Sequence, residues 1–251
     1  MRRLLTDTWT LFRREMLRYA RDRAYWIGQL VFPIAIVGFV GFGLDEVVEL
    51  PSGVAFVSHL STGMLALIVG SGAVGGGFSL IEDRESGFLR SLLVAPVSRA
   101  SIVLAKLAAR VVASLVLVAL LGGCLALVQP IAVPNAGAVL LAIVGVTAVF
   151  VALGVSLATR LRRLESFRML AALVTIPLYL FSGIFYPLST LPAWVSVPAY
   201  ANPMTYGADL LRFGLLGAHE LPVALSVGML TLLSGVAVAV GVLMFDRGVR
   251  G

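Results

Sequence analysis

Charged residues are scarce in this chain of 251 residues: they make up 13% of it, whereas 59% of the residues are hydrophobic. A soluble domain of this length carries roughly 25% charged residues to cover its surface. The apolar residues also gather in runs of about twenty, which is long enough to cross the hydrocarbon core of a bilayer. The composition therefore excludes an ordinary soluble protein and indicates an integral membrane protein.

Cysteine, histidine and lysine are nearly absent, and each shortage excludes a class of function. Cys124 is alone and cannot form an internal disulfide, and the two histidines, His59 and His219, are too few for a metal cluster. Lys106, the one lysine, lacks the Gly-Lys-Ser/Thr context of a phosphate-binding loop. We therefore expect no catalytic residue, metal or cofactor in this chain, and energy for any transport must come from another subunit.

Six apolar segments are long enough to span a membrane as helices at about 1.5 Å per residue. We predict spans at 24–44, 54–79, 105–128, 136–159, 167–187 and 222–245. Eighteen of the 19 basic residues lie on one side of these spans and Arg212 alone lies on the other, which predicts that both termini are cytoplasmic. The basic residues form no groove with interleaved aromatics, so nucleic acid is not an expected partner. His59 is expected as a polar side chain near the outer membrane interface.

Residues 1–23 are too polar to span, yet their apolar residues recur at helical spacing. The stripe consists of Leu5, Trp9, Phe12, Met16 and Tyr19. Arginines fill the opposite face, a pattern that predicts an amphipathic helix on the inner leaflet in contact with anionic lipid. A plain charged tail is the alternative.

The loop after the second span carries a short amphipathic segment. It begins with alternating charges at 82–85 and continues with Phe88, Leu89 and Leu92 at helical spacing before Pro96. Because the residue before proline is disfavoured in a helix, we predict a helix at about 82–95. Its apolar face requires a partner surface, either another protein or the chain's own inner rim.

The outer segment 188–221 is long for a loop and is not polar. Thr190 and the pair Asn202-Pro203 each resemble a helix start, with a capping side chain beside a proline in the first turn. We predict two short helices that dip back toward the membrane. Asp209 and Arg212 stand three residues apart in the second helix, so we expect them to pair on one face.

The second span is rich in glycine. The residues concerned are Gly70, Gly72, Gly75, Gly76 and Gly77. Small residues let helices approach closely and shift against one another, which suits a transporter that alternates between two states. Static helix packing is the alternative interpretation.

Three motifs, taken together, resemble those of ABC type-2 transporter permeases. They are the loop from Glu82 to Arg99, the segment Phe181-Ser182-Gly183-Ile184-Phe185-Tyr186-Pro187, and the segment from Asn202-Pro203-Met204-Thr205-Tyr206 through Asp209 to Arg212. The resemblance covers essentially the whole chain in order, length and topology. The chain looks closest to daunorubicin-type, drug-resistance export permeases, although a branch that handles lipo-oligosaccharides and polysaccharides has similar motifs.

The resemblance implies one transmembrane domain over 1–251, with a tail at 246–251, in the plasma membrane. It implies a homodimer or a heterodimer, with each permease bound to a cytoplasmic ABC ATPase that holds ATP and Mg²⁺. Residues 1–23 correspond to the connecting helix, 82–95 to the coupling helix, and 188–216 to the re-entrant helices. Facing second and fifth spans of the two subunits line the substrate path.

Particular residues then acquire expected roles. Contacts with the ATPase are expected from Glu82, Arg84, Glu85, Gly87, Phe88, Leu89 and Leu92. Contacts with a hydrophobic drug-like, lipid or lipid-linked glycan substrate are expected from Tyr179, Phe181, Phe185 and Tyr186. The re-entrant helices are expected to depend on Asn202, Pro203, Asp209 and Arg212.

Two other classes of function stay open. One is an ion-coupled secondary carrier, although the predicted spans hold no acidic residue of the kind such carriers use. The other is a membrane assembly protein that transports nothing.

Overall fold

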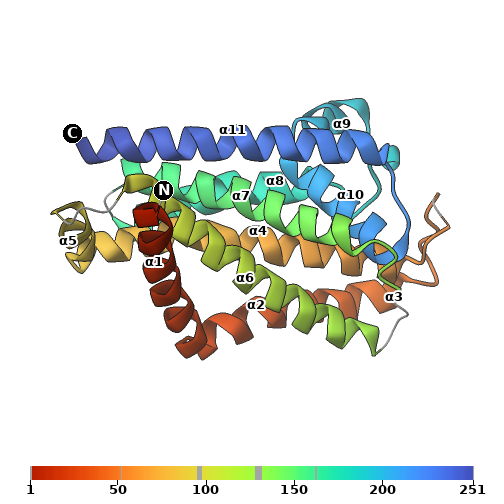
Figure 1. Ribbon diagram of the computed structural model, residues 1–251. Coiled ribbons are helices and arrows are strands. Elements are labelled where there is room, and N and C mark those ends of the chain that lie inside the picture. The colour runs from red at the N-terminus through yellow and green to blue at the C-terminus, as the bar shows by residue number, and fades with distance from the viewer. Residues whose placement is uncertain (1, 52, 95–97, 128–131, 162, 251) are drawn as a thin grey trace.

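The computed structural model describes residues 2–51, 53–94, 98–127, 132–161 and 163–250, and every regular element in these ranges is a helix (Figure 1). The elements are α1 (Arg2–Arg21), α2 (Arg23–Ile36), the π-helical turn η1 (Val37–Gly41), α3 (Phe42–Leu44), α4 (Phe56–Glu85), α5 (Phe88–Val94), α6 (Arg99–Ala126), α7 (Ala136–Arg160), α8 (Leu164–Leu180), the 3-10 turn η2 (Leu188–Thr190), α9 (Ala193–Tyr200), α10 (Pro203–Leu216) and α11 (Val223–Arg250). The all-helical prediction is confirmed for these residues.

Five helical stretches in the described part of the chain are long and apolar enough to cross a membrane. They are Arg23–Leu44, which joins α2, η1 and α3, followed by Phe56–Glu85, Ala100–Ala126, Ala136–Arg160 and Val223–Asp246. They correspond to the first, second, third, fourth and sixth of the predicted spans.

The predicted span at 167–187 has a different end in the structure. α8 has 17 residues and ends at Leu180, so it is about 26 Å long, shorter than the roughly 30 Å of a hydrocarbon core. The helix stops because the Asn202 side-chain amide donates to the carbonyls of Leu178 and Phe181, at 2.6 and 3.0 Å. These bonds stabilise the open end of α8, and Gly183 then turns the chain with a φ of +70°.

α4 lies at the centre of the bundle and packs against α2, α6, α7, α8 and α10. In its most apolar window 78% of the residues are buried, compared with 17% in the first span and 11% in α11. The first span and α11 therefore present their apolar side chains outward, to lipid or to another membrane protein.

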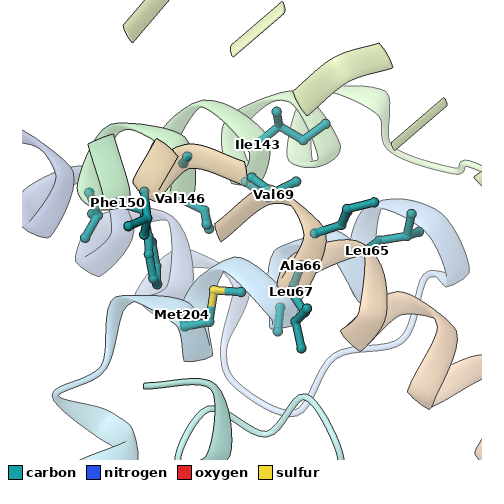
Figure 2. Close-up of a cluster of buried hydrophobic side chains, with 14 of the residues drawn as sticks. Leu65, Ala66, Leu67, Val69, Ile143, Val146, Phe150 and Met204 are labelled. Atoms are coloured by element: carbon teal, nitrogen blue, oxygen red, sulfur yellow. The ribbon is translucent and has the colours of Figure 1, made fainter. Parts of the chain in front are cut away.

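Buried side chains of α4, α7 and α10 meet in the core (Figure 2). Its labelled side chains are Leu65, Ala66, Leu67 and Val69 of α4, Ile143, Val146 and Phe150 of α7, and Met204 of α10. Nearby, a methyl group added at Gly77 of α4 would stand 2.1 Å from the carbonyl oxygen of Gly154 in α7. At Gly77 the missing side chain thus serves close static packing of two helices.

The short loop helix is shorter than the predicted 82–95. α4 continues through Glu85, Gly87 turns the chain with a φ of +74°, and α5 begins at Phe88. The charged residues 82–85 therefore form the last turn of α4. Pro96 lies outside the described residues.

The third span also starts earlier than predicted, at Arg99 instead of residue 105. Ser98 caps α6, because its hydroxyl accepts a hydrogen bond from the backbone N–H of Ser101 at 3.1 Å. Lys106 and Arg110 consequently lie well inside α6. α4 likewise extends beyond its predicted end at residue 79 and continues to Glu85, so Asp83 lies inside a helix. This contradicts the expectation that the spans hold no acidic residue.

α1 runs across the bundle and packs on α6, which confirms a helix over the N-terminal segment (Figure 1). From the predicted stripe, Phe12, Met16 and Tyr19 pack with Ala109 and Ala113 of α6. Trp9 is 64% exposed, and the Leu5 side chain lies outside the described ones.

The segment between α8 and α11 contains α9 and α10, so the prediction of two short helices is confirmed. Asn202 caps α10 as expected: its side-chain oxygen accepts from the backbone N–H of Met204 at 3.0 Å, and Pro203 is the first helical residue. The expected cap at Thr190 is wrong. Thr190 belongs to η2, and α9 begins only after Pro192, because the chain stays extended between them.

Candidate functional site

Four charged side chains meet at the end of α4 that leads into α5. Lys106 on α6 donates from Nζ to Glu15 Oε1 at 2.9 Å and to Asp83 Oδ2 at 2.7 Å. Lys106 also donates to the hydroxyl of Ser79 at 2.8 Å. Arg14 on α1 donates from Nη2 to Asp83 Oδ1 at 2.7 Å. We call Arg14, Glu15, Asp83 and Lys106 the α5-end network.

The α5-end network is largely buried and electrically balanced. Glu15, Asp83 and Lys106 are each no more than 3% exposed, and two acids face two bases. Buried charges persist in a protein only when they are paired and hydrogen-bonded. The network therefore ties α1, α4 and α6 together, although these helices are far apart in the sequence.

α5 packs its apolar face against the chain's own rim, beside this network. The guanidinium carbon of Arg14 lies 3.7 Å from the centroid of the Phe88 ring, a cation–π contact. Leu89 is 4% exposed, and Leu92 is partly buried against the same core. The chain's own rim, which was one of the two expected partners, thus contacts this face. Arg14 thus links Phe88 of α5 to Asp83 near the end of α4.

Two more charged residues of the last turn of α4 make contacts, one with α1 again and one with the end of α7. Glu82 forms an ion pair with Arg18 of α1. Arg84 donates to the carbonyl of Leu161 at 3.0 Å, immediately after α7. The end of α4 is therefore also bonded to the chain directly after α7.

The surface that stays open to a partner lies at the turn and at the far end of α5. Glu85 and Ser86 are exposed, and Gly87 makes the turn between α4 and α5. Val94, at the end of α5, is 89% exposed. A partner protein at this end of the bundle would meet these residues first.

The four aromatic residues expected to contact a substrate lie at the end of α8 and in the turn after it. The Tyr179 ring stacks on Phe150 of α7 with centroids 5.7 Å apart. Phe185 packs against the core, and the Tyr186 hydroxyl donates to the carbonyl of Leu180. Phe181 directly follows the last residue of α8 and caps the helix. These contacts order the turn, and a role of the four residues in substrate binding stays a prediction.

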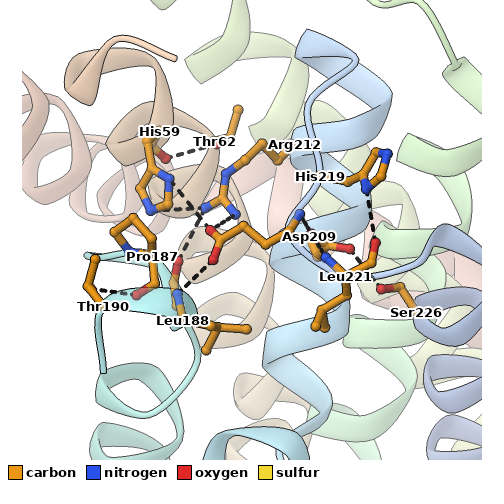
Figure 3. Close-up of polar contacts among 12 residues, drawn as sticks. His59, Thr62, Pro187, Leu188, Thr190, Asp209, Arg212, His219, Leu221 and Ser226 are labelled. Atoms are coloured by element: carbon orange, nitrogen blue, oxygen red, sulfur yellow. Dashed lines mark hydrogen bonds and ion pairs between the residues drawn. The ribbon is translucent and has the colours of Figure 1, made fainter. Parts of the chain in front are cut away.

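Arg212 of α10 is the centre of a second polar group, at the opposite end of α4 (Figure 3). It donates from Nη1 to Glu220 Oε1 at 3.0 Å and from Nη2 to the carbonyl of Gly183 at 3.2 Å. The same Nη2 lies 3.2 Å from Nε2 of His59. His59 is 1% exposed, because Arg212 and Glu220 enclose its side chain, and its expected place near the outer membrane interface stays a prediction. We call His59, Asp209, Arg212 and Glu220 the α10-end network.

The expected pairing of Asp209 with Arg212 is also wrong, because each side chain has a closer partner. Asp209 Oδ1 accepts from the backbone N–H of Glu220 at 2.8 Å, and its Oδ2 accepts from the Ser226 hydroxyl at 2.7 Å. Glu220 supplies the carboxylate for Arg212 and also accepts from the backbone N–H of Leu188 at 2.6 Å. Burial raises the pKa of the Glu220 carboxyl, and the neighbouring Arg212 guanidinium opposes that shift.

Both networks contain members that sequence reasoning misses. In the charge pattern, Lys106 counts as one of the basic residues of the loop after the second span. A lone lysine in an apolar helix instead indicates a buried partner for its charge. Glu15 lies three positions from Phe12 and four from Tyr19, on the face of α1 that is otherwise apolar. An acid on an otherwise apolar helix face indicates a buried cationic partner, and this signal could have identified Glu15. Among the described residues, no group of three or more His, Cys, Asp or Glu side chains could hold a metal ion.

Comparison with known proteins gives consistent matches. The family model described as ABC-2 type transporter matches residues 6–216. A protein of Porphyra purpurea that carries the name of a transport permease, ycf38, is 29% identical over 219 residues, covering 84% of this chain and 74% of its own length. Proteins of the same name from Pyropia yezoensis and Cyanophora paradoxa are 28% and 30% identical, over 84% and 63% of this chain and 74% and 56% of their own lengths.

Proposed function

Because this chain belongs to the ABC-2 type transporter family, we propose that it exports a hydrophobic drug-like, lipid or lipid-linked glycan substrate from the cytoplasm. The chain is a multi-pass permease subunit, and the family's membrane domain has no ATPase site. Permeases of this family generally pair with ABC ATPase subunits, so ATP and Mg²⁺ belong to that partner. The plasma membrane is the proposed location, with efflux as the direction of transport.

The observation that carries this proposal is the contact of Arg14 with both Phe88 and Asp83. ATP-driven closure of the ATPase moves the α4–α5 turn and α5, and Arg14 passes that movement to the central helix α4. The exposed Glu85 is the residue we expect the ATPase to contact most directly, with Glu82, Arg84 and Gly87 shaping the turn. Phe88, Leu89 and Leu92 then act by holding α5 to the membrane domain.

The proposed arrangement has six spans, with α8 as a short fifth one and α9 and α10 as re-entrant helices. The α5 end is proposed to be cytoplasmic, together with both termini. Figure 1 supports this, because the C-terminal end of α11 and α5 lie at the same end of the bundle. A second permease copy is proposed to pack near α8, whose Met169, Leu173 and Ile176 form an apolar stripe with exposures of 76%, 65% and 53%. The path then runs between α4 and α8 of the two copies, past Tyr179, Phe181, Phe185 and Tyr186.

The test is purification of the full chain in mild detergent together with the ATPase that accompanies it. We expect candidate substrates to stimulate ATP hydrolysis several-fold in the complex. Glu85→Ala should abolish that stimulation without lowering the midpoint of thermal unfolding, because Glu85 is exposed. Glu165→Ala is the matched control: it removes an exposed acid from the first turn of α8 and should leave the stimulation intact.

Three results would overturn the proposal or its parts. Equal stimulation in wild type and Glu85→Ala would remove the coupling role of the α4–α5 turn. Transport that continues without ATP and stops when an ion gradient is dissipated would indicate a secondary carrier. A stable complex whose ATPase rate no substrate changes would indicate an assembly protein.

A further inference from the structure

Arg110 lies on α6 one turn beyond Lys106, and it is buried without an acid. It is 5% exposed, and its Nη1 donates to the Tyr25 hydroxyl at 3.0 Å. Its guanidinium carbon lies 4.4 Å from the centroid of the Tyr19 ring. Its Nε is buried with no hydrogen-bond partner. Among the described residues, these partners are neutral, so the charge of Arg110 is not compensated.

The acids nearest to this region are already engaged. Glu82 pairs with Arg18, and the carboxylate of Asp22 accepts from the backbone N–H of Tyr25 at 2.9 Å, which caps α2. The acids of the α5-end network are held by Lys106 and Arg14. An uncompensated guanidinium inside a membrane-spanning helix is costly and is ordinarily kept for function. Arg110 is about 16 Å along α6 from its first residue, Arg99.

Arg110 lines a half-open cavity of about 360 Å³, and its other lining residues come mainly from α1, α2, α4 and α8. On the α4 side, the absence of a side chain at Gly75 leaves room for the guanidinium: a methyl group added at Gly75 would stand 2.3 Å from Arg110 Nη2. Tyr19 adds a second unpartnered group, a buried hydroxyl without a hydrogen bond. Burial raises the pKa of Tyr19, and so its hydroxyl keeps the proton that it can donate. Arg18 and Arg168 also line the cavity, as do the two engaged acids Asp22 and Glu82.

We propose that this cavity binds the phosphate group of a membrane amphiphile, with Arg110 as the principal cation. A guanidinium presents its donors in a planar fork that matches two phosphate oxygens. The cavity wall includes the junction of α1 and α2, and α1 has the amphipathic character of a helix at the headgroup layer, where lipid phosphates lie. The site goes beyond the proposed export function, since a phosphate-bearing amphiphile can occupy it as cargo or as a resident lipid.

The test is a binding titration on the full chain, purified in a non-ionic detergent, with three probes. Dioctanoyl phosphatidic acid carries the phosphate and short chains, dioctanoylglycerol has the same chains without phosphate, and inorganic phosphate is the free anion. We expect saturable binding of the phosphatidic acid and at least about tenfold weaker binding of the diacylglycerol, because charged hydrogen bonds to the guanidinium are lost.

Variants of the chain then assign the binding to Arg110. Arg110→Gln should weaken phosphatidic acid binding about tenfold, and Arg110→Lys, which keeps the charge and loses the fork, should weaken it less. Gly75→Ala keeps Arg110 but displaces its guanidinium, so it should also weaken binding. Arg163→Gln is the matched control, because Arg163 is an exposed arginine outside the cavity lining. Its affinity should equal that of wild type, and gel filtration checks that each variant is folded.

Each outcome decides the proposal. Competition by millimolar inorganic phosphate supports a site that accepts the anion alone, whereas its failure to compete assigns the site to a lipid-borne phosphate. Equal affinity for phosphatidic acid and diacylglycerol would overturn the proposal. Unchanged affinity in folded Arg110→Gln would overturn it as well. If Arg110→Gln does not fold, unchanged affinity in both Arg110→Lys and Gly75→Ala would overturn it. None of these measurements uses ATP or transport, so a failure here leaves the export proposal standing.

Discussion

The two polar networks lie at opposite ends of α4, and they differ in how much of the chain they join. In the α5-end network, Lys106 binds Glu15, which is 91 residues away in the sequence, and Asp83, which is 23 residues away. In the α10-end network, Arg212 and Glu220 are only 8 residues apart, although His59 adds a distant contact. The first network therefore joins α1, α4 and α6, whereas the second joins α10 and the loop that follows it to α4 through His59 and to α11 through Ser226.

The two networks also differ in the elements and groups that they contact. The α5-end network touches α5, whose Val94 is almost fully exposed, and it includes α1, which runs across the bundle. The α10-end network is closed by backbone groups, the Gly183 carbonyl and the N–H of Leu188. The first network contacts α5, so a movement of α5 can reach α4 through it, whereas the contacts of the second lie at the other end of α4. Breaking the first network should therefore change both stability and coupling, and breaking the second should change stability alone.

The largest expected effect is that of Lys106→Met. This change leaves the buried carboxylates of Glu15 and Asp83 with Arg14 as their remaining cation, and removing one member of a buried ion group destabilises by about 3–5 kcal/mol. We expect a large fall in the thermal unfolding midpoint of the detergent-purified chain. We also expect loss of substrate-stimulated ATP hydrolysis in the complex.

Two further variants separate the loss of charge balance from the loss of packing. Lys106→Arg keeps a cation and should retain most of the stability. Adding Glu15→Gln to Lys106→Met removes one unpaired acid and should restore part of the unfolding midpoint. If Lys106→Met unfolds at the wild-type temperature, the network holds nothing together and the contrast between the two ends of α4 disappears.

Arg212→Met should have a smaller effect, and of a different kind. It leaves the Gly183 carbonyl without this donor and leaves Glu220, whose side chain is 13% exposed, without its cation. We expect destabilisation by about 2–3 kcal/mol, measured as a lower unfolding midpoint. The ATP hydrolysed per folded complex should still respond to substrate, because α5 and the α5-end network are untouched.

Arg163→Met is the control for removing a positive charge at an exposed position, and it should change stability by less than about 0.5 kcal/mol. The comparison fails if Arg212→Met abolishes the ATPase response while the protein stays folded. That result would mean that the α10-end network also passes on movement.

The contrast between the networks follows from what a sequence pattern can and cannot record. Long apolar runs predict five spans well, because lipid solvation acts on each helix separately. The end of α8 is different: the apolar pattern continues through Phe185, but Asn202, far along the chain, takes the carbonyls of Leu178 and Phe181. The hydropathy of residues 167–187 cannot predict these two hydrogen bonds, so it cannot predict where α8 ends.

Charged residues mislead in the same way at the α5 end. A charge in an apolar stretch is taken as the end of a span, so the predicted helices stop at residue 79 and begin at residue 105. In the structure Asp83 and Lys106 neutralise each other, and both helices continue past them. The apolar stripe of α1 predicts its packing face correctly through Phe12 and Tyr19, yet it gives no partner for Glu15 between them. Such pairings are properties of the folded chain.

The smallest predicted effect concerns the pH dependence of the α10 end, and it tests whether Glu220 acts mainly as a buried acid or as an ion partner. Burial raises the pKa of Glu220, with Arg212 opposing, so Glu220 binds a proton more readily in the folded state than in the unfolded state. The stabilisation from that proton is fully present below the pKa of a free glutamate, about 4.3, and is lost as the pH rises through the raised folded pKa. Glu220→Gln does not titrate, so its unfolding midpoint relative to wild type should rise as the pH increases above about 4.3.

Glu165→Gln, at an exposed position, corrects this comparison for the loss of one carboxylate. A relative midpoint that falls as the pH rises would mean that Arg212 outweighs burial and that Glu220 stabilises the fold as a carboxylate. The α10-end network would then be a charge pair of the same kind as the α5-end network. In that case the difference between the two ends of α4 would rest only on which helices they join.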